Sequence, residues 1–396
     1  MTRPLHIGLI AQGGANWMGG AEYIRNLTHA VGQLDGTDGW AARTSLIYGE
    51  KQRADWEDAE APSKIFIPRR PREWPLLWRF IPRGNKHFQN PVERAKCDFI
   101  YPLSYDNLYN VDVKFPLGFE KRSFQWAGWI PDFQHRHLPD WFPAKELARR
   151  ERGIAALVAE APIVVLSSQT AAEDFSRFFS EAQPKARVLT FATHPNPSWY
   201  SDDCGEDLRW LPPRFFLVSN QFWKHKNHLL VFEALRILSG RGLDPVVVCT
   251  GQVQDFRDPD YANVILQSIH RYGLSGQILL LGLVPRRTQI EMMRRCLAVI
   301  QPSLFEGWST VVEDARVLGK PAFLSDLAVH REQNPPGSEF FDAKSPEALA
   351  DLLARAWDSF APGPNSALEA AARERATERA VDFGRTFLEI AAQACG

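Results

Sequence analysis

The sequence predicts an α/β protein built from two doubly wound, Rossmann-like domains that face each other across a cleft. Three observations predict this fold. Short apolar runs rich in β-branched residues alternate with stretches of helical periodicity, the alternation occurs twice along the chain, and a segment without periodicity separates the two occurrences. Strands of this kind favour parallel sheets that are covered by helices on both faces. With 396 residues, the chain is long enough for two such cores.

The first half opens with a strand, a glycine-rich loop and a helix. The strand and the start of the loop are expected within 5–14 and the helix at 19–34, where Ile24 and Leu27 have helical spacing. Three further strands are expected, within 98–103, 126–133 and 161–166. A helix should follow the last of them, with an N-cap at one of three positions, Ser167, Ser168 or Thr170.

A segment rich in Pro, Asp and Ser, 191–214, is expected to be the linker. Beyond it the alternation restarts. Strands are expected within 214–220, 245–251, 277–282, 297–303 and 321–326, and helices within 227–242, 261–274, 287–296 and 310–319. The predicted boundaries are 1–205 for the first domain, 206–375 for the second, and 376–396 for a C-terminal helix.

Composition excludes several classes of function. The formal net charge of -1 and the pI near 6.8 give no global field toward nucleic acid or anionic lipid. Five scattered cysteines without a Cys-x-x-Cys pair predict reduced thiols and no zinc site. No run approaches the roughly 20 apolar residues that span a bilayer. We therefore expect a cytoplasmic protein without a metal or other cofactor, with peripheral contact at the inner face of the membrane left open.

The loop Gln12–Glu22 places four glycines between a strand and a helix N-terminus. Glycines let backbone amides approach an anion, and the helix end adds a partial positive charge. A phosphate could bind here. The spacing is not Gly-x-Gly-x-x-Gly, so the loop gives little support to a nicotinamide dinucleotide site, and a simple tight turn is an equal alternative.

A basic cluster follows the first strand of the second half. Lys224, His225, Lys226 and His228 stand where a loop meets a helix. Fixed positive charge at this point suits a diphosphate leaving group, because it stabilises negative charge that develops there. The alternative is a solvated basic face.

Three acids lie near the strand within 297–303 and the helix that follows it. Glu306 precedes Gly307 at the end of the strand, so its carboxylate and the amides after it could converge on one ligand. Glu313 and Asp314 are neighbours on a helix, about 100° apart, and cannot both face the same ligand. One of the two is expected at the surface. Asp314 could instead stabilise an early helical turn through the helix dipole.

The stretch 305–321, "FEGWSTVVEDARVLGKP", resembles the Glu-x7-Glu signature of the retaining nucleotide-sugar glycosyltransferases of the GT-B fold, glycosyltransferase family 4. The resemblance extends to "GGAEYIRNL", "SNQFWKHKNH", "LLLGLVP" and "SDLAVHREQ" in the order that the family shows. These motifs together cover most of the chain. The resemblance implies a donor bound mainly by the second domain, an acceptor bound mainly by the first, and C-terminal helices that return to the first domain.

The resemblance assigns roles residue by residue. Glu306 looks like the first acid, which contacts the transferred sugar, and Asp314 stands at the second acid, which holds the ribose. Glu313 remains a fallback for the ribose contact and is expected in solvent. Lys226 matches the lysine on the diphosphate, while Gln221 replaces an expected arginine. The implied donor-binding residues are Gly19, Gly20, Gln221, Lys224, Lys226, Val284, Glu306, Gly307, Ser309, Thr310 and Asp314.

Two segments of the first half have less specific signals. The stretch 126–142 resembles the region where the family often has a histidine near the reacting carbon, so Asp132 and His135 are assigned to the acceptor side, and His135 joins Glu306 and Lys226 as a catalytic candidate. A histidine packed among aromatic residues is the alternative. The basic, aromatic segment 68–86 could meet a membrane or pack inside the domain.

The expected function is therefore transfer of a hexose, mannose-type by analogy, from a nucleoside diphosphate sugar to a glycan or lipid-linked saccharide. Bacterial surface polysaccharide assembly, such as O-antigen synthesis, is the expected setting. Two alternatives stay open: a nucleotide-sugar epimerase on the same fold, and a non-catalytic module that binds nucleotide sugars. Asp258–Asp260 has the form of a metal-binding Asp-x-Asp motif but lacks its surroundings.

Overall fold

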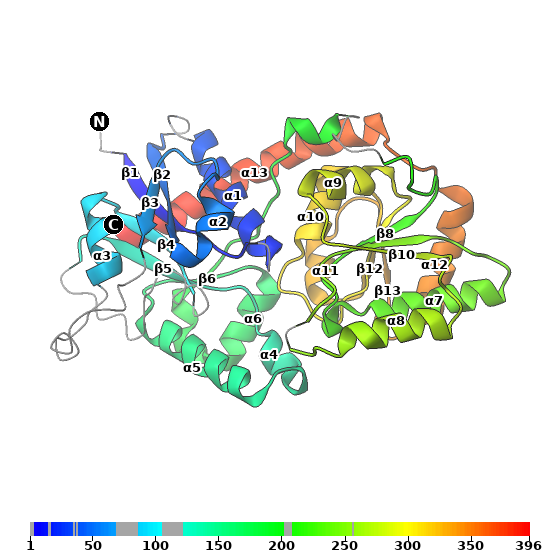
Figure 1. Ribbon diagram of the computed structural model, residues 1–396. Coiled ribbons are helices and arrows are strands. Elements are labelled where there is room, and N and C mark those ends of the chain that lie inside the picture. Colours follow the sequence, from blue (N-terminus) through cyan, green and yellow to red (C-terminus); the bar gives the residue numbers. More distant parts are fainter. Residues whose placement is uncertain are drawn as a thin grey trace. The chain divides into compact units, whose positions relative to one another are not determined.

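The computed structural model describes residues 4–14, 17–34, 36, 39–68, 86–104, 122–201, 208–255 and 257–396 (Figure 1). By its internal contacts the chain divides into two compact units. Unit 1 comprises Met1–Ala192 together with Arg379–Gly396, and unit 2 comprises Thr193–Glu378. Each is a parallel sheet with helices packed against it, as the alternation in the sequence predicts.

Unit 1 contains a seven-stranded sheet with the order β3-β2-β1-β4-β5-β6-β7. All its strand pairs are parallel. The strands are β1 Leu5–Ile10, β2 Ala42–Gly49, β3 Lys64–Ile67, β4 Phe99–Leu103, β5 Gln125–Ile130, β6 Val164–Leu166 and β7 Ala186–Val188. The order reverses between β1 and β4, so the glycine-rich loop after β1 lies at the topological switch point of this sheet.

Helices cover both faces of that sheet. The helices are α1 Met18–Leu34, α3 Lys86–Arg94, α5 Ala144–Glu160 and α6 Gln169–Phe178, with the short turns α2 Arg53–Trp56 and α4 Gln134–His137. The apolar sides of α3, α5 and α6 form one core cluster with the strands. Ser168 caps α6 by accepting a hydrogen bond from the amide of Ala171, which selects one of the three predicted caps.

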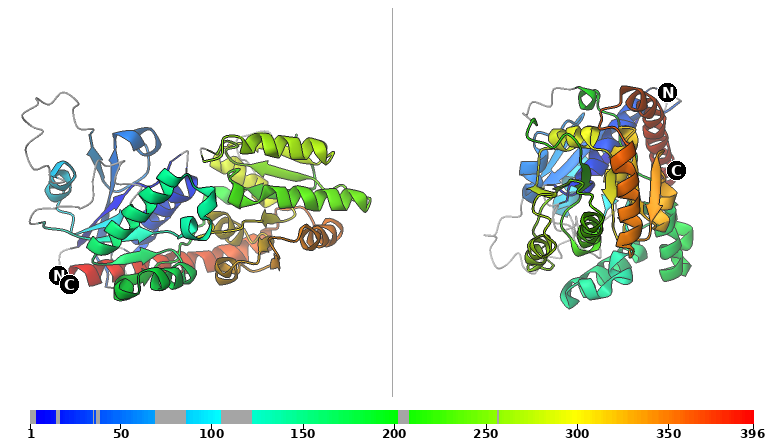
Figure 2. Two further views of the ribbon diagram at one scale, coloured as in Figure 1. Left: turned by 90° about the horizontal axis from the view of Figure 1, so that it is seen from below. Right: turned by 90° about the vertical axis from the view of Figure 1, so that its right-hand side faces the viewer.

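The last helix of the chain, α13 Ser366–Cys395, contributes to both units. In unit 1 the ring of Phe387 packs 5.2 Å from that of Tyr101, and the ring of Phe383 packs 5.9 Å from that of Tyr23, measured between ring centroids. Figure 2 shows this end of α13, in red, running beside the strands of unit 1. The C-terminal residues therefore belong to the core of the first unit.

Unit 2 contains a six-stranded parallel sheet with the order β10-β9-β8-β11-β12-β13. Its strands are β8 Phe216–Ser219, β9 Val247–Thr250, β10 Ile278–Gly282, β11 Val299–Gln301, β12 Ala322–Ser325 and β13 Ser338–Phe341. The first five match the predicted strands, while β13, like β2, β3 and β7, has no counterpart among the predictions. The order reverses between β8 and β11, which are neighbours in the sheet.

Two layers of helices enclose the second sheet. One core cluster includes residues of α7 His228–Gly240, α8 Tyr261–Arg271 and α12 Pro346–Ser359. A separate cluster includes residues of α9 Arg286–Arg295 and α10 Thr310–Val317. The short helix α11 Ala328–Gln333 follows β12. The 3-10 turns of the chain are η1 Glu50–Gln52, η4 Pro139–Trp141, η5 Ser180–Lys185, η6 Pro197–Tyr200 and η7 Lys224–Lys226.

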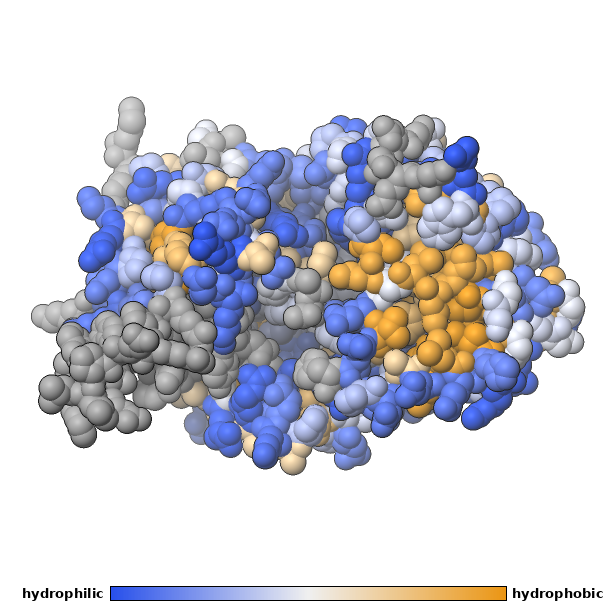
Figure 3. Space-filling model, viewed as in Figure 1, coloured by the Kyte–Doolittle hydropathy of each residue, from blue (hydrophilic) through white to orange (hydrophobic). Residues whose placement is uncertain are grey.

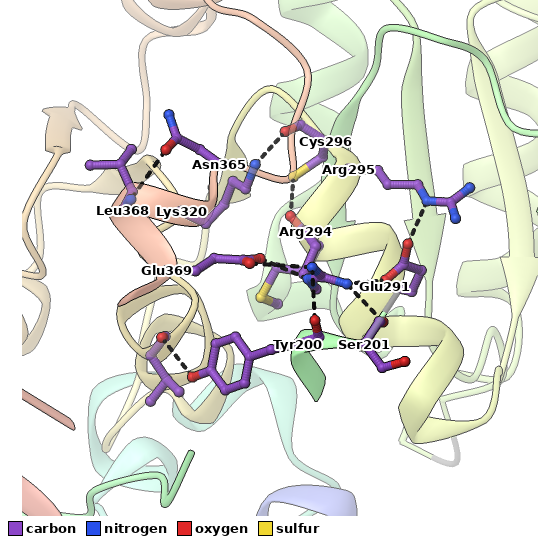
Figure 4. A network of polar contacts seen from close by, with 12 residues as sticks. Tyr200, Ser201, Glu291, Arg294, Arg295, Cys296, Lys320, Asn365, Leu368 and Glu369 are labelled. Atoms are coloured by element: carbon purple, nitrogen blue, oxygen red, sulfur yellow. Dashed lines mark hydrogen bonds and ion pairs between the residues drawn. The ribbon is translucent and has the colours of Figure 1, made fainter. Parts of the chain in front are cut away.

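A buried arginine holds three segments of unit 2 together (Figure 4). Arg294 of α9 is 2% exposed, and its guanidinium donates to both carboxylate oxygens of Glu369 on α13, at 2.7 and 3.2 Å. It also donates to Glu291 at 2.9 Å and to the backbone oxygen of Ser201 at 2.9 Å. Burial would lower the pKa of Arg294, but the two carboxylates outweigh it and raise that pKa above its ordinary value. The Arg294 side chain thus links α13 and the segment around Ser201 to α9.

The β10 edge of unit 2 carries a patch of apolar side chains, visible in Figure 3. Leu283 just beyond β10 is 55% exposed, and Val264 and Leu266 of α8 are 42% and 54% exposed. The strand itself, Ile278–Gly282, contains no charged residue. An uncharged edge strand of this kind is open to pairing with a further strand.

Within the described ranges no helix is both long and apolar enough to span a membrane. The basic segment 68–86, for which a membrane contact was one of the two expectations, lies outside the described residues from 69 to 85.

Candidate active site at the carboxyl edge of the second sheet

The switch point of the second sheet brings Lys226 and Glu306 together. Lys226 ends the turn η7 after β8, and Glu306 follows β11. Between the lysine and α7 stands Asn227 in the left-handed conformation (φ 56°), which asparagine tolerates better than most residues. Its side-chain amide donates to the backbone oxygens of Pro302, at 3.1 Å, and Ala343, at 3.0 Å. The lysine loop is thereby fastened to the loop after β11.

Three donors converge on one oxygen of Glu306. Its Oε1 accepts from Nζ of Lys226 at 2.6 Å, from Nε2 of Gln301 at 2.7 Å and from Oγ of Ser303 at 2.7 Å. Burial would raise the pKa of Glu306, but Lys226, His330 and the Ser303 hydroxyl outweigh it, and the pKa lies below its usual value. Glu306 is therefore a carboxylate at neutral pH although its side chain is only 8% exposed.

The orientation of Gln301 follows from a neighbouring strand. Its Oε1 accepts from Nδ2 of Asn220 at 2.8 Å, so its Nε2 must point toward Glu306. Asn220 follows β8 directly, and Gln301 is the last residue of β11. The ends of the two switch-point strands thus cooperate in holding the same carboxylate.

The N-terminus of α10 is built by Ser309 and Gln333. The Ser309 hydroxyl accepts from the amide of Val312 and caps the helix. Gln333 of α11 accepts from the Ser309 amide at 3.1 Å and donates to the Ser309 carbonyl at 3.0 Å. Within the described residues the amides of Gly307 and Thr310 form no hydrogen bond. They are half-buried and lie at the positive end of the helix dipole, where an anion would be stabilised.

Asp314 and Glu313 are both buried, each 1% exposed. The prediction that one of them, Glu313, is in solvent is therefore wrong. Glu313 pairs with Arg316 at 3.1 Å and accepts from Nε2 of Gln333 at 3.1 Å. Adjacent residues of a helix do point about 100° apart, but the side of α10 that carries Glu313 is covered by α11 instead of water.

Asp314 faces a different partner. Its two oxygens accept from the two terminal nitrogens of Arg286, each at 2.7 Å, and Oδ1 also accepts from the hydroxyl of Thr193 at 3.3 Å. Arg286 is the first residue of α9, shortly after β10. The predicted ribose ligand is therefore one half of a bidentate ion pair.

The remaining donor-side predictions lie on loops around this edge. Lys224 is exposed, whereas His225 is 5% exposed and His228 is 0% exposed, so the "KHKNH" run is not a fully solvated face. Gln221 follows β8, and Val284 follows β10 and is half-buried.

Gly19 and Gly20 lie in unit 1, in the first turn of α1. A Cβ at Gly20 would stand 2.7 Å from the ring of Trp17, which explains the small residue at this position. Gly13 has φ +60°, and a Cβ there would meet the backbone oxygen of Trp17 at 2.1 Å. The loop is thus tightly folded, while its residues 15 and 16 lie outside the described part.

His135 is buried in unit 1, 1% exposed, and its Nε2 lies 3.1 Å from Oε1 of Glu151 on α5. Burial lowers the pKa of His135 to about 4 despite the nearby carboxylate. Asp132 accepts from the amide of Gln134 at 2.9 Å. The structure therefore brings His135 together with Glu151 and packs it near the ring of Phe133.

No group of three or more potential metal ligands occurs in the described part of the chain. Near the Asp258–Asp260 motif, Asp255 forms an ion pair with Arg257 at 3.0 Å. The cysteines at 97, 249, 296 and 395 are free thiols, and burial raises the pKa of Cys97 and Cys249 to about 12.

Several residues at this edge were absent from the predicted site: Thr193, Asn220, Arg286, Gln301, Ser303 and Gln333. Arg286 could have been found from its position just after a strand end. Gln301 and Ser303 stand five and three residues before Glu306, which accepts hydrogen bonds from both. Asn220, which orients Gln301, is 81 positions away, and nothing in the local sequence signals that contact.

Comparison with known proteins finds a family match over most of unit 2. Residues 207–375 match the family model of Glycosyl transferases group 1. No curated protein sequence matches the chain.

Solved structures share the fold at low sequence identity. HepE of Anabaena in complex with UDP and glucose has a TM-score of 0.70 at 17% identity, covering 98% of this chain and 100% of its own. Sucrose-phosphate synthase from Thermosynechococcus elongatus has a TM-score of 0.66 at 18% identity, with coverages of 98% and 97%. WaaG, a glycosyltransferase involved in lipopolysaccharide biosynthesis, has a TM-score of 0.61 at 14% identity, with coverages of 99% and 100%. The fold is that of the GT-B structures.

Proposed function

We propose that the chain, a glycosyltransferase with a group 1 domain at residues 207–375, transfers a hexose from a nucleoside diphosphate sugar with retention of anomeric configuration. The acceptor would be a glycan or a lipid-linked saccharide. The observation that carries the proposal is the pair of Lys226 and Glu306, joined at 2.6 Å on the loops that follow β8 and β11. Doubly wound sheets bind their ligands at this point.

Lys226 would stabilise the diphosphate as it leaves. An ammonium group has three donors, and within the described residues Nζ gives one of them to Glu306. The remaining donors, together with the amides of Gly307 and Thr310, would face the phosphate oxygens. Positive charge that is fixed before the reaction stabilises the developing negative charge without reorganisation. Because these groups supply the charge, we expect turnover to persist in EDTA.

Glu306 would hold the transferred sugar. Its Oε1 is occupied by three donors, and within the described residues its Oε2 accepts no hydrogen bond. A carboxylate oxygen so oriented is a good acceptor for a sugar hydroxyl. Retention of configuration is supported by the resemblance of the sequence around Glu306 to retaining enzymes.

The donor sugar and the setting are finer parts of the proposal. The sequence motifs of the second half favour a mannose-type hexose. The HepE structures contain UDP, glucose or UDP-glucose. GDP-mannose and UDP-glucose are therefore the first donors to test. Bacterial surface polysaccharide synthesis, such as that of O-antigen, is supported by the likeness to WaaG. We place the reaction in the cytoplasm, at the inner face of the membrane.

The acceptor is assigned to unit 1, at the carboxyl edge of its sheet. Gly19 and Gly20 follow β1 there, and Asp132 and His135 follow β5. Since burial keeps His135 neutral at pH 7, its part would be to form a hydrogen bond and not to supply charge.

The test combines binding and turnover. Thermal shift with UDP, GDP, ADP and dTDP identifies the nucleotide, and its hexose donors are then incubated with saccharide acceptors while nucleotide release is followed. NMR of the product reports its anomeric configuration. Wild type should release nucleotide in step with product, and Glu306→Gln and Lys226→Ala should lose at least about 100-fold in kcat while remaining folded. The matched control is Glu339→Gln, which removes an exposed ion-paired carboxylate of the same unit.

The other outcomes separate the alternatives. An isomerised sugar formed from the donor without any acceptor would assign an epimerase. Tight nucleotide binding without release or transfer would assign a binding module. Wild-type turnover in Glu306→Gln would remove the assignment of this site.

A further inference from the structure

In the ion pair of Arg286 and Asp314, the arginine side chain is partly exposed to solvent and the aspartate side chain is buried. Both carboxylate oxygens of Asp314 are engaged by Arg286, at 2.7 Å each, and Oδ1 also by Thr193. The side chain of Asp314 is 1% exposed, whereas that of Arg286 is 22% exposed. A ligand that arrives from solvent would meet the guanidinium before the carboxylate.

Arg286 is held in place by a chain of polar contacts along the edge of the sheet. Its Nη1 donates to Oε1 of Gln289 at 3.0 Å, and Nε2 of Gln289 donates to the hydroxyl of Ser219 at 2.5 Å. Ser219 ends β8 and shares a hydrogen bond of 2.9 Å with Thr250, which ends β9. The Arg286 guanidinium also lies over the ring of Trp199, 5.0 Å from its centroid. The arginine is therefore pre-oriented at the carboxyl edge, where the donor nucleotide is proposed to bind.

We propose that Arg286 is the side chain that contacts the ribose hydroxyls of the donor, and that Asp314 is a positioning residue that holds Arg286. This inference rests on the proposed function and names a specificity determinant within it. It assigns to Arg286 the ribose contact that the family resemblance implies for Asp314.

Two physical arguments favour the arginine. Freeing Asp314 for a ribose would break a bidentate pair and leave a buried carboxylate uncompensated, which costs more than hydroxyl contacts return. In the pair as it stands both oxygens of Asp314 accept hydrogen bonds. The planar guanidinium is a hydrogen-bond donor, and the oxygens of ribose hydroxyls are acceptors. The shorter Asp, in place of the Glu at the second acid of the motif, fits an acid that reaches a protein partner instead of a ligand.

The test compares ribonucleotide with deoxynucleotide binding by calorimetry on the full chain. UDP is compared with 2′-deoxy-UDP and 3′-deoxy-UDP, or the GDP series is used if GDP is the nucleotide bound. Wild type should lose about 10-fold or more in affinity when a hydroxyl is removed. Arg286→Ala should bind UDP about 10- to 100-fold more weakly and show a ribose-to-deoxy ratio near 1. Asp314→Asn should weaken UDP binding but keep a ratio above 1.

Arg287→Ala is the matched control, since Arg287 is an exposed cation on the same turn of α9, and its ratio should equal that of wild type. Circular dichroism checks each fold, and Arg286→Lys gives a second variant, with a reduced ratio, if Arg286→Ala does not fold. Because the ratio is taken within one variant, a loss of stability cannot imitate the effect.

The inference is overturned if Arg286→Ala keeps the wild-type ratio, if Asp314→Asn abolishes it while Arg286→Ala does not, or if wild type binds UDP with a ratio near 1. Tighter UDP binding by Arg286→Ala would also overturn it, since the arginine would then compete with the ligand. Absence of any nucleotide binding by wild type would instead remove the proposed function, and the inference with it.

Discussion

The Nζ of Lys226 and the Oε1 of Glu306 lie 2.6 Å apart, on loops that follow the two strands between which the second sheet reverses its order. Lys226 is 15% exposed and Glu306 is 8% exposed, so each charge depends on the other for compensation. The same pair is proposed to receive a diphosphate and a sugar. The contribution of this pair to the stability of unit 2 and its role in turnover can therefore be separated by paired substitutions.

Lys226→Met is expected to destabilise unit 2 by about 3 kcal/mol, because it leaves the Glu306 carboxylate buried without its cation. Adding Glu306→Gln should recover at least about 1 kcal/mol of that loss without restoring turnover. Urea unfolding of wild type, both single variants and the double variant gives the coupling. Strict additivity of the two losses would contradict the pairing.

Arg294 should be far more important for stability than its neighbour Arg295. Arg294→Met breaks buried contacts to Glu291 and Glu369 and is expected to cost about 3–5 kcal/mol. Arg295 is 34% exposed, and Arg295→Met should cost less than about 1 kcal/mol. Urea unfolding followed by circular dichroism measures both, and equal losses would contradict the network in Figure 4.

Gln333 should set the stability of the α10 N-terminus. Gln333→Leu leaves the Ser309 amide and carbonyl and one Glu313 oxygen without this partner, so a loss of at least about 2 kcal/mol is expected. Ser345→Ala, which removes the N-cap of α12, is the comparison and should cost about 1 kcal/mol. A smaller loss for Gln333→Leu than for Ser345→Ala would argue against the role given to Gln333.

His228 should make the protein sensitive to acid. Burial and Lys226 lower the pKa of His228 to about 3, and its ring stacks 4.1 Å from that of Phe222. Below pH 6.5 the unfolded chain binds a proton that the folded chain does not, so stability falls as pH drops from about 6.5 toward 3, by about 1.4 kcal/mol per pH unit for this group. His228→Phe should therefore reduce the loss of melting temperature between pH 7.5 and 5.

At pH 7.5, where both states hold His228 neutral, His228→Phe should change stability by less than about 1.5 kcal/mol. Other buried histidines, among them His225 and His330, have lowered pKa values and keep part of the slope in the variant. A variant with the full wild-type slope would show that His228 is protonated in the folded state.

The sequence was sufficient for the fold because its signals were local. Apolar strands and helical periodicity identified β8 to β12 and their helices, and a carboxylate and a lysine at strand ends pointed to Glu306 and Lys226. The strands β2, β3, β7 and β13 had no counterpart among the predictions. Two of them, β3 and β13, have exposed or half-buried residues at most positions, which weakens an apolar signal.

The partners of Asp314 and Glu313 on other helices could not be predicted, because these contacts join residues far apart in the chain. Arg286 and Asp314 are separated by 28 positions, and Gln333 stands 20 positions from Glu313. Helical geometry gave the angle between Glu313 and Asp314 correctly, but it carries no information on which side of α10 another helix covers. Both acids are buried because α10 is packed on more than one side.

The central claim, that the donor binds where Lys226 and Glu306 meet, is tested most directly by hydrogen–deuterium exchange of the full chain with and without saturating UDP, or GDP if only that nucleotide raises the melting temperature. The account predicts protection of peptides covering 219–228 and 303–312, and loss of that protection in Lys226→Ala. Nucleotide binding with protection confined to other peptides, or with these two unchanged, would contradict it.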